Sequence, residues 1–167
     1  MNQTESKRSF SIRKAEKADV PVILDFIEKL AEYEKLSQEV VATESDLELH
    51  LFGDRPVAEV LIGYEGKNPV AFTLFFHNFS TFLGMPGIYL EDLFVLEEYR
   101  GKGYGTKMLA SLASLAEERK CGRLEWAVLD WNEPSIEFYK SLGARMMNEW
   151  IVNRMSGESL ANLAARY

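Results

Sequence analysis

The sequence predicts a mixed α/β domain in which a largely antiparallel sheet is followed by a β-α-β unit. Three features of the chain support this prediction. Segments that alternate apolar and polar residues are interspersed with segments of helical spacing. The stretch Glu65-Gly66-Lys67-Asn68-Pro69 separates two strand-like segments, as a hairpin turn would. A glycine-rich turn around Gly103 then joins a strand to a helix.

Apolar side chains at three- and four-residue spacing predict the helices. Asp19 stands in the capping position of the first helix, with Pro21 just inside it, and Thr43 caps the second. Gly143 follows the fourth helix in the position of a terminating glycine. We expect helices at residues 20–31, 43–51, 103–120, 132–142 and 160–166.

Strands are predicted where apolar residues alternate or run continuously between turn residues. We expect them at residues 10–12, 57–64, 70–76, 87–96 and 123–129, with a last pair of short strands within residues 144–155. Residues 1–8 are expected to form a frayed tail and residues 9–167 a single domain. A chain of 167 residues is long enough for a hydrophobic core of its own.

Composition and charge narrow the class of protein. The net charge of −7 argues against a nucleic-acid partner and is compatible with a cationic one. The chain has no run of about 18 apolar residues that would predict a membrane span, and its first ten residues lack the apolar stretch of a secretory signal. One cysteine, Cys121, and two histidines favour a cytoplasmic protein without a His- or Cys-based metal site.

The glycine-rich turn is the most informative segment. The start of a helix presents free N–H groups and the positive end of its dipole to phosphate, and glycines let the backbone approach such a ligand closely. The order Gly105-Thr106-Lys107 does not fit the P-loop, and the third glycine comes one residue too early for the dinucleotide fingerprint. The turn instead matches the pattern Arg/Gln-x-x-Gly-x-Gly/Ala at Arg100, Gly103 and Gly105.

Carboxylates are concentrated early in the chain. Between Asp25 and Glu48 there are eight carboxylates and two lysines, a density that would attract a di- or polyamine. Most of these side chains, such as Glu32, are predicted to lie on solvated helix faces. Glu34 differs because it continues the inward-facing helical series, and Tyr33 beside it can stack on an amine.

A second acidic site lies in the strand before the glycine-rich turn. Strand alternation places Glu91 on one face with the apolar side chains of Tyr89, Leu93 and Val95, and Asp92 on the other face. An ionisable side chain among apolar neighbours is suited to proton transfer. Glu91 is the first candidate for a general base and Asp92 the second.

These segments together resemble a known family. The turn is similar to the pyrophosphate loop of the GCN5-related N-acetyltransferases (GNAT superfamily). More specific pieces, Leu30-Ala31-Glu32-Tyr33-Glu34, Tyr89-Leu90-Glu91-Asp92 and Trp131-Asn132-Glu133-Pro134-Ser135-Ile136 with Phe138-Tyr139-Lys140, resemble the spermidine/spermine (diamine) acetyltransferases and their thialysine-acetylating relatives. The likeness runs from Ser11 to about Trp150.

The resemblance implies a GNAT fold with a central mixed, largely antiparallel sheet flanked by helices. It implies an N-acetyltransferase that uses acetyl-CoA as co-substrate, without a metal, and that acetylates a primary amine of a small cationic substrate, a polyamine or a lysine-like amino acid, by direct attack. A homodimer is expected, with no nucleic-acid or membrane partner. Two other functions stay open: acetylation of a protein N-terminus or lysine, and a non-catalytic CoA-binding regulatory module.

The resemblance also implies roles for individual residues. Tyr139 would protonate the departing CoA thiolate, and Glu91 would act through water as the base. The residues implied to bind the cofactor are Leu93, Phe94 and Val95 for pantetheine, Arg100, Gly101, Lys102, Gly103, Tyr104, Gly105 and Thr106 for the pyrophosphate, and Asn132, Glu133, Pro134 and Ser135. The acceptor site would be lined by Tyr33, Glu34, Glu91, Glu125, Trp126 and Ala127.

Overall fold

The structure, a computed structural model, describes residues 9–167, so the predicted tail at residues 1–8 lies outside the described residues. The chain divides into two compact units, Met1–Ala127 and Val128–Tyr167, and each is described by itself. The expectation of one domain over residues 9–167 stays a prediction.

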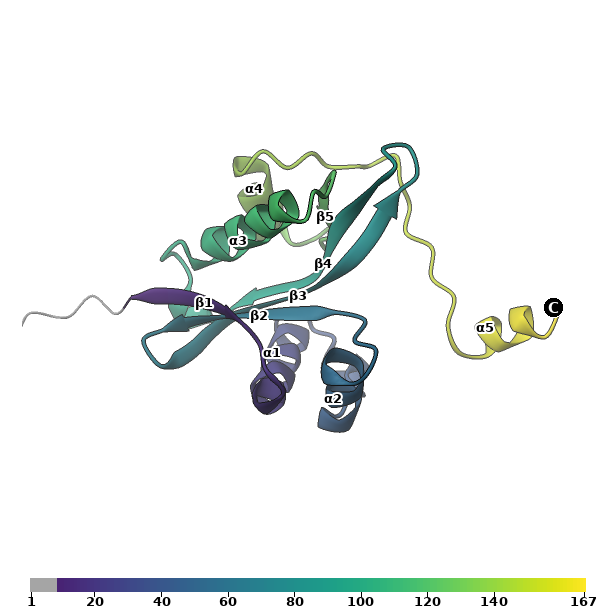
Figure 1. Ribbon diagram of the computed structural model, residues 1–167, viewed down its shortest axis with the longest axis horizontal. Coiled ribbons are helices and arrows are strands. Elements are labelled where there is room, and N and C mark those ends of the chain that lie inside the picture. The colour runs from purple at the N-terminus through teal and green to yellow at the C-terminus, as the bar shows by residue number, and fades with distance from the viewer. Residues whose placement is uncertain (1–8) are drawn as a thin grey trace, which may run out of the picture. The chain divides into compact units, whose positions relative to one another are not determined.

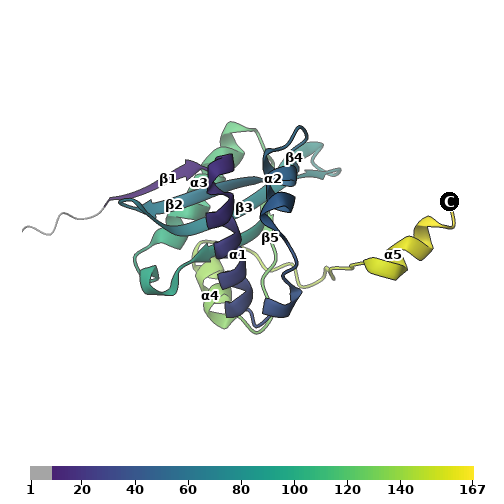
Figure 2. The same ribbon diagram turned by 90° about the horizontal axis from the view of Figure 1, so that it is seen from below.

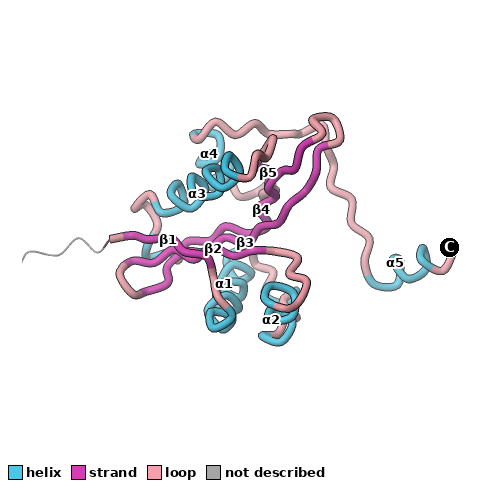
Figure 3. Tube along the Cα trace, viewed as in Figure 1, coloured by secondary structure: helices cyan, strands magenta, loops and turns pink. Residues whose placement is uncertain are grey.

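The first unit is built on a five-stranded sheet with the order β1-β2-β3-β4-β5 (Figure 3). The first four strands pair antiparallel, whereas β4 and β5 run parallel. The predicted mixed, largely antiparallel sheet is therefore confirmed. The strands are β1 (Phe10–Lys14), β2 (Glu59–Glu65), β3 (Asn68–Ser80), β4 (Met85–Val95) and β5 (Leu124–Trp126).

Helices cover both faces of this sheet. Helices α1 (Val20–Tyr33) and α2 (Glu44–Phe52) lie on one face, here called the α1 face, and α3 (Tyr104–Glu118) lies on the other, the α3 face (Figures 1 and 2). Three short 3-10 helices, η1 (Lys17–Asp19), η2 (Ser37–Glu39) and η3 (Glu97–Tyr99), lie in the connections. Among residues 9–167, no helix combines the length and apolar character needed to cross a membrane.

The core on the α1 face explains why the first helix forms where it does. Phe26 of α1 stacks on Phe72 of β3, with ring centroids 5.1 Å apart. Ile23, Val60 and Ile62 are buried in the same cluster. Burying side chains of this size contributes about 1.5–3 kcal/mol each. On the α3 face, Met108 and Leu112 of α3 are fully buried at helical spacing.

The start of the first helix differs from the prediction in one respect. Asp19 does occupy the position before α1, but its carboxylate does not cap that helix. It accepts two hydrogen bonds of 2.7 Å from the guanidinium of Arg13 and one from the backbone N–H of Glu16. Thr43 caps α2 as predicted, in a reciprocal capping box with Asp46.

The second unit contains α4 (Glu133–Ser141) and α5 (Gly157–Ala164). The side chain of Asn132 accepts a hydrogen bond of 3.3 Å from Ser135 N and caps α4. Gly143 follows the helix with φ +89°, as a terminating glycine does.

The predicted pair of short strands within residues 144–155 is wrong, because this segment contains no strand. Ile151 and Val152 have strand-forming side chains, but they are 82% and 78% exposed. A strand preference has no effect without a neighbouring strand to pair with. The strand predicted at residues 123–129 is likewise shortened to the three residues of β5.

Candidate active site

The glycine-rich turn forms the passage from η3 to α3. Gly101 and Gly103 have φ values of +76° and +78°, a conformation that favours glycine, and the space around the position of a Cβ atom is open at both. Gly103 precedes α3 and no side chain caps that helix. The first N–H groups of α3 are therefore left to an external acceptor. This geometry fits an anionic group such as a diphosphate.

The loop is tied to the sheet through one buried carboxylate. Glu65, the last residue of β2, accepts a hydrogen bond from the hydroxyl of Tyr104 and forms an ion pair of 3.0 Å with Nζ of Lys102. The Lys102 ammonium also lies 4.6 Å from the ring centroid of Tyr99. Lys102 therefore contributes to the shape of the loop, and Glu65 balances much of its charge.

A β-bulge separates the two candidate bases. Leu74 of β3 pairs with Asp92, whereas Phe75 pairs with Leu90, so Glu91 is the extra residue on β4. Glu91 is exposed, so the predicted apolar surroundings of this carboxylate are wrong. The prediction assumed strict alternation, and one extra residue breaks it.

Asp92 is the perturbed carboxylate of the pair. Its partner Leu74 packs against the core under α1 and α2, so Asp92 lies on the α1 face. Burial, followed by the charges of Glu91 and Glu34, raises the pKa of Asp92 to about 7. Burial also raises the pKa of Glu34, which is half-buried at the end of α1. Strand β4 and the end of α1 thus bring three predicted site carboxylates together.

Tyr33, Phe94 and Arg100 form an aromatic and cationic cluster in the same region. The rings of Tyr33 and Phe94 are 6.4 Å apart at 52°. The guanidinium carbon of Arg100 lies 4.5 Å from the centroid of Tyr33 and 5.4 Å from that of Phe94. A residue predicted for the cofactor loop therefore stacks on a residue predicted for the acceptor site.

Strand β5 holds Glu125 and Trp126, with Ala127 directly after it. The carboxylate of Glu125 accepts a hydrogen bond of 2.8 Å from Asn78 and forms an ion pair of 2.9 Å with Arg123. Glu125 pairs in register with Tyr89. Burial, and then the charges of Glu91 and Glu125, raise the pKa of Tyr89. Glu125 is thus held by two protein partners.

In the second unit, α4 carries four of the predicted site residues, and Asn132 precedes it. Asn132 is the buried cap, Glu133 and Pro134 form the first turn, and Ser135 donates its backbone N–H to the Asn132 side chain. Tyr139 is buried, with its ring 5.3 Å from that of Phe138. The roles of these residues remain predictions.

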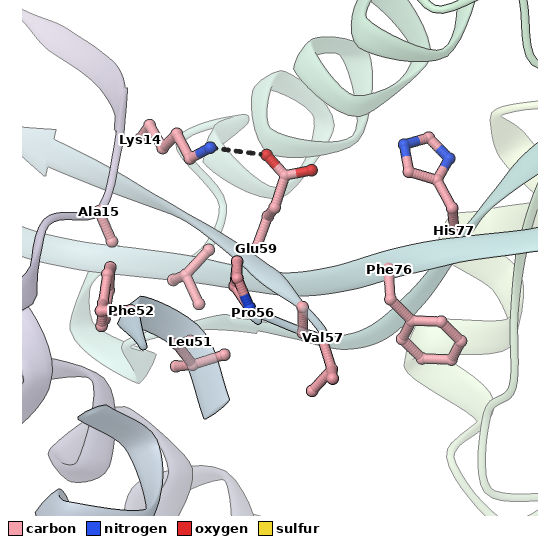
Figure 4. A pocket seen from close by; sticks show the side chains of 11 residues that line it. Lys14, Ala15, Leu51, Phe52, Pro56, Val57, Glu59, Phe76 and His77 are labelled. Carbon is pink, nitrogen blue, oxygen red and sulfur yellow. Dashed lines mark hydrogen bonds and ion pairs between the residues drawn. The ribbon is translucent and has the colours of Figure 1, made fainter. Parts of the chain in front are cut away.

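A pocket of about 590 Å³ is lined by other residues (Figure 4). Its walls come from the end of β1, the end of α2, the connection to β2, the start of β2, and β3, and none of the predicted site residues lines it. Of its lining residues, Lys14 pairs with Glu59 at 2.8 Å, and hydrogen bonds from Arg119 and Lys14 lower the pKa of Glu59 to about 2. Within residues 9–167 no group of three or more His, Cys, Asp or Glu side chains is placed to hold a metal ion.

Comparison with known proteins gives a consistent result. The model of the acetyltransferase (GNAT) family matches residues 25–144. The chain is 40% identical to thialysine N-epsilon-acetyltransferase of Sus scrofa, over 95% of this chain and 99% of that protein. It is 33% identical to L-ornithine N5-acetyltransferase NATA1 of Arabidopsis thaliana, over 92% of this chain and 87% of that protein.

Among solved structures, an integron cassette protein from V. cholerae superposes with a TM-score of 0.78 at 28% identity, over 93% of this chain and 98% of that one. The family model and these relatives define the class as an acyltransferase, and the chain belongs to the acetyltransferase (GNAT) family. The predicted family and enzyme class are confirmed. Enzymes of this family use acetyl-CoA as co-substrate.

Proposed function

We propose that this enzyme transfers the acetyl group of acetyl-CoA to a primary amine of a small cationic substrate, a polyamine or a lysine-like amino acid. The observation that carries the proposal is the group of three carboxylates, Asp92, Glu91 and Glu34, in one region of β4 and α1. Such a group attracts a protonated amine and supplies a base to deprotonate it. The names of the relatives, which include thialysine and ornithine acetyltransferases, support the same substrate class.

The reaction we propose needs no covalent intermediate with the enzyme. The amine nitrogen attacks the thioester carbonyl, an N–C bond forms and the C–S bond breaks. Asp92 takes the proton of the amine, since its pKa of about 7 suits a base at neutral pH. Glu91, beside it on the bulge, is the competing candidate and would act through water. Tyr139 donates a proton to the leaving thiolate.

The binding roles follow the same arrangement. Residues 100–106 hold the diphosphate, and the open space at Gly101 and Gly103 suits a closely approaching anion. The backbone of residues 93–95 holds the pantetheine arm, and residues 132–135 add further contacts to the co-substrate. Tyr33 and Glu34 bind the cationic acceptor, and residues 125–127 also line its site.

We also propose that the enzyme is a cytoplasmic homodimer. The single cysteine, Cys121, is free, as is usual for proteins of a reducing compartment. The net charge of −7 disfavours nucleic acid and anionic membrane surfaces as partners. Light scattering and cell fractionation test the two statements separately.

The function is tested by calorimetry with CoA, followed by a steady-state screen with acetyl-CoA. The panel contains spermidine, spermine, putrescine, lysine, thialysine, an aminoglycoside and a peptide with a free N-terminus. We expect CoA binding and the highest kcat/KM with a polyamine or a lysine-like amine. Preference for the peptide would favour a protein acetyltransferase, and binding of CoA without any turnover would favour a regulatory module.

A further inference from the structure

Arg100 lies where two parts of the proposed active site meet. It is the first residue of the glycine-loop pattern, and its guanidinium carbon lies 4.5 Å from the ring centroid of Tyr33, at the end of α1. Tyr33 precedes Glu34, the half-buried acid of the acceptor region. A single side chain thus spans from the loop expected to hold the diphosphate to the wall expected to hold the amine.

Arg100 is fixed by contacts on two sides. Its Nε donates a hydrogen bond of 3.0 Å to the carbonyl oxygen of Val95, in the strand end that is expected to hold pantetheine. Its guanidinium carbon lies 4.5 Å from the ring centroid of Tyr33 and 5.4 Å from that of Phe94. Within the part of the chain that the structure describes, its Nη nitrogens make no hydrogen bond or ion pair. The end of the guanidinium fork is therefore available to an anion.

We propose that Arg100 is a positioning residue. It fixes the position of Tyr33, which is expected to line the amine site, relative to the backbone of Val95 and Gly101, which is expected to bind CoA. This inference rests on the proposed function. An anion bound at the Nη nitrogens limits the movement of the guanidinium, and the guanidinium in turn limits the movement of the Tyr33 ring. Binding of CoA and binding of the amine consequently support each other, and the effect is reciprocal.

The chemistry of the contact requires arginine. A planar guanidinium can stack on a ring, donate Nε to a carbonyl and still present two nitrogens to phosphate, whereas an ammonium is a single point charge. A lysine at this position would keep the charge near the loop, but its ammonium cannot stack as a plane and donate to Val95 while it presents two further nitrogens to phosphate. Exchange of arginine for lysine therefore separates positioning from charge.

The test uses substitutions at both ends of the contact. Tyr33→Leu removes the ring, and Tyr33→Phe keeps it; Tyr33→Met serves as a second ring-free variant in case the leucine variant does not fold. Arg100→Lys and the double variant Arg100→Lys with Tyr33→Leu complete a double-mutant cycle. The matched control is Tyr64→Leu, because Arg13 of β1 lies 4.9 Å from the ring centroid of Tyr64 of β2, in a contact that includes no residue of the glycine loop. Each protein is titrated with CoA by calorimetry and assayed for the KM of its best amine.

We expect Tyr33→Leu to weaken CoA binding about two- to fivefold, the effect of one exposed cation–π contact, although Tyr33 has no assigned contact with CoA. Tyr33→Phe should restore the affinity, and Tyr64→Leu should leave it unchanged. The double variant should bind CoA no more weakly than Arg100→Lys alone. An unchanged CoA affinity in both ring-free variants, or effects that multiply in the double variant, would overturn the inference. Failure of the unaltered enzyme to bind CoA would instead refute the proposed function.

Discussion

Glu91 and Asp92 are neighbours in the chain but differ sharply in environment. The bulge opposite Leu74 and Phe75 leaves Glu91 exposed as the extra residue of β4 and turns Asp92 toward the α1 face. Burial and two neighbouring acids raise the pKa of Asp92 to about 7, close to the pH at which a base must work. The fold thereby distinguishes two carboxylates that a sequence pattern treats as alternatives.

The first prediction separates these two acids by their effect on the pH profile. For the unaltered enzyme, kcat/KM should rise as the pH increases through about 7, because Asp92 must lose its proton before it accepts another. Asp92→Asn should lower kcat by about 10²–10⁴-fold and remove this rise of kcat/KM with pH, the ascending limb of the profile. Glu91→Gln, the adjacent control, should keep the limb and move it to lower pH, since Glu91 helps to raise the pKa of Asp92. An inactive Glu91→Gln beside an active Asp92→Asn would identify Glu91 as the base.

The second prediction concerns stability. The pKa of Asp92 in the folded protein lies above the ordinary value of 3.8, so the unfolded chain gives up its proton first as the pH rises. The free energy of unfolding should therefore fall as the pH rises from 4 to 7, and this loss of stability should be complete above pH 7. Asp92→Asn should unfold at a higher temperature than the unaltered protein at pH 8 and at the same temperature at pH 4. Calorimetric melting curves at the two pH values provide the measurement, and equal shifts at both would contradict the assignment.

The third prediction concerns the acceptor site. Glu34→Gln should raise the KM for a diamine roughly tenfold, as expected for the loss of about 1.4 kcal/mol of charge attraction, and should leave the affinity for CoA unchanged. Glu32→Gln is the matched control, because Glu32 is exposed on the same helix. Steady-state kinetics with the best amine decide the matter. A KM that responds equally to both substitutions would show that only the general charge of α1 is at work.

The fourth prediction compares two glycines. Gly103 and Gly84 both have positive φ, +78° and +64°, and both have open space where a Cβ would stand. Replacement by alanine should destabilise each variant similarly, by about 1 kcal/mol. Only Gly103→Ala should weaken CoA binding, by an expected tenfold or more, because its methyl group occupies space that the diphosphate needs. Calorimetric titration and melting curves measure the two effects, and equal CoA affinities would remove the loop from the binding site.

The fifth prediction concerns the proton donor. Tyr139→Phe removes one hydroxyl from a buried ring and should lower kcat at least tenfold, because the leaving thiolate loses its acid. The dissociation constant for CoA should stay within twofold of the original. Single-turnover and binding measurements on the same preparation separate the two effects. Unchanged turnover would exclude Tyr139 from the chemistry.

Local signals in the sequence were sufficient for much of this fold. The hairpin between β2 and β3 follows from a two-residue turn at Gly66 and Lys67, and Gly66 has the positive φ of +65° that such turns require. The glycine-rich turn and its helix follow from the spacing of the glycines and of the apolar side chains. Glu34 is half-buried, as its place in the helical series predicts.

The remaining features depend on contacts between distant segments. The residues near Glu91 do not predict a bulge, because the extra residue is defined only by the pairing of β4 with β3. The sequence predicts Asp19 to cap a helix, but its carboxylate instead accepts hydrogen bonds from Arg13 of the preceding strand. The stack of Arg100 on Tyr33 joins residues from α1 and the loop after β4, and neither motif alone predicts it.

Glu65 links the hairpin between β2 and β3 to the start of α3, because it binds both Lys102 and Tyr104. A genetic selection for altered use of acetyl-CoA would therefore recover substitutions on a strand far from the loop in sequence. Such variants would lie far from the loop in sequence, although they remove contacts that hold the loop directly.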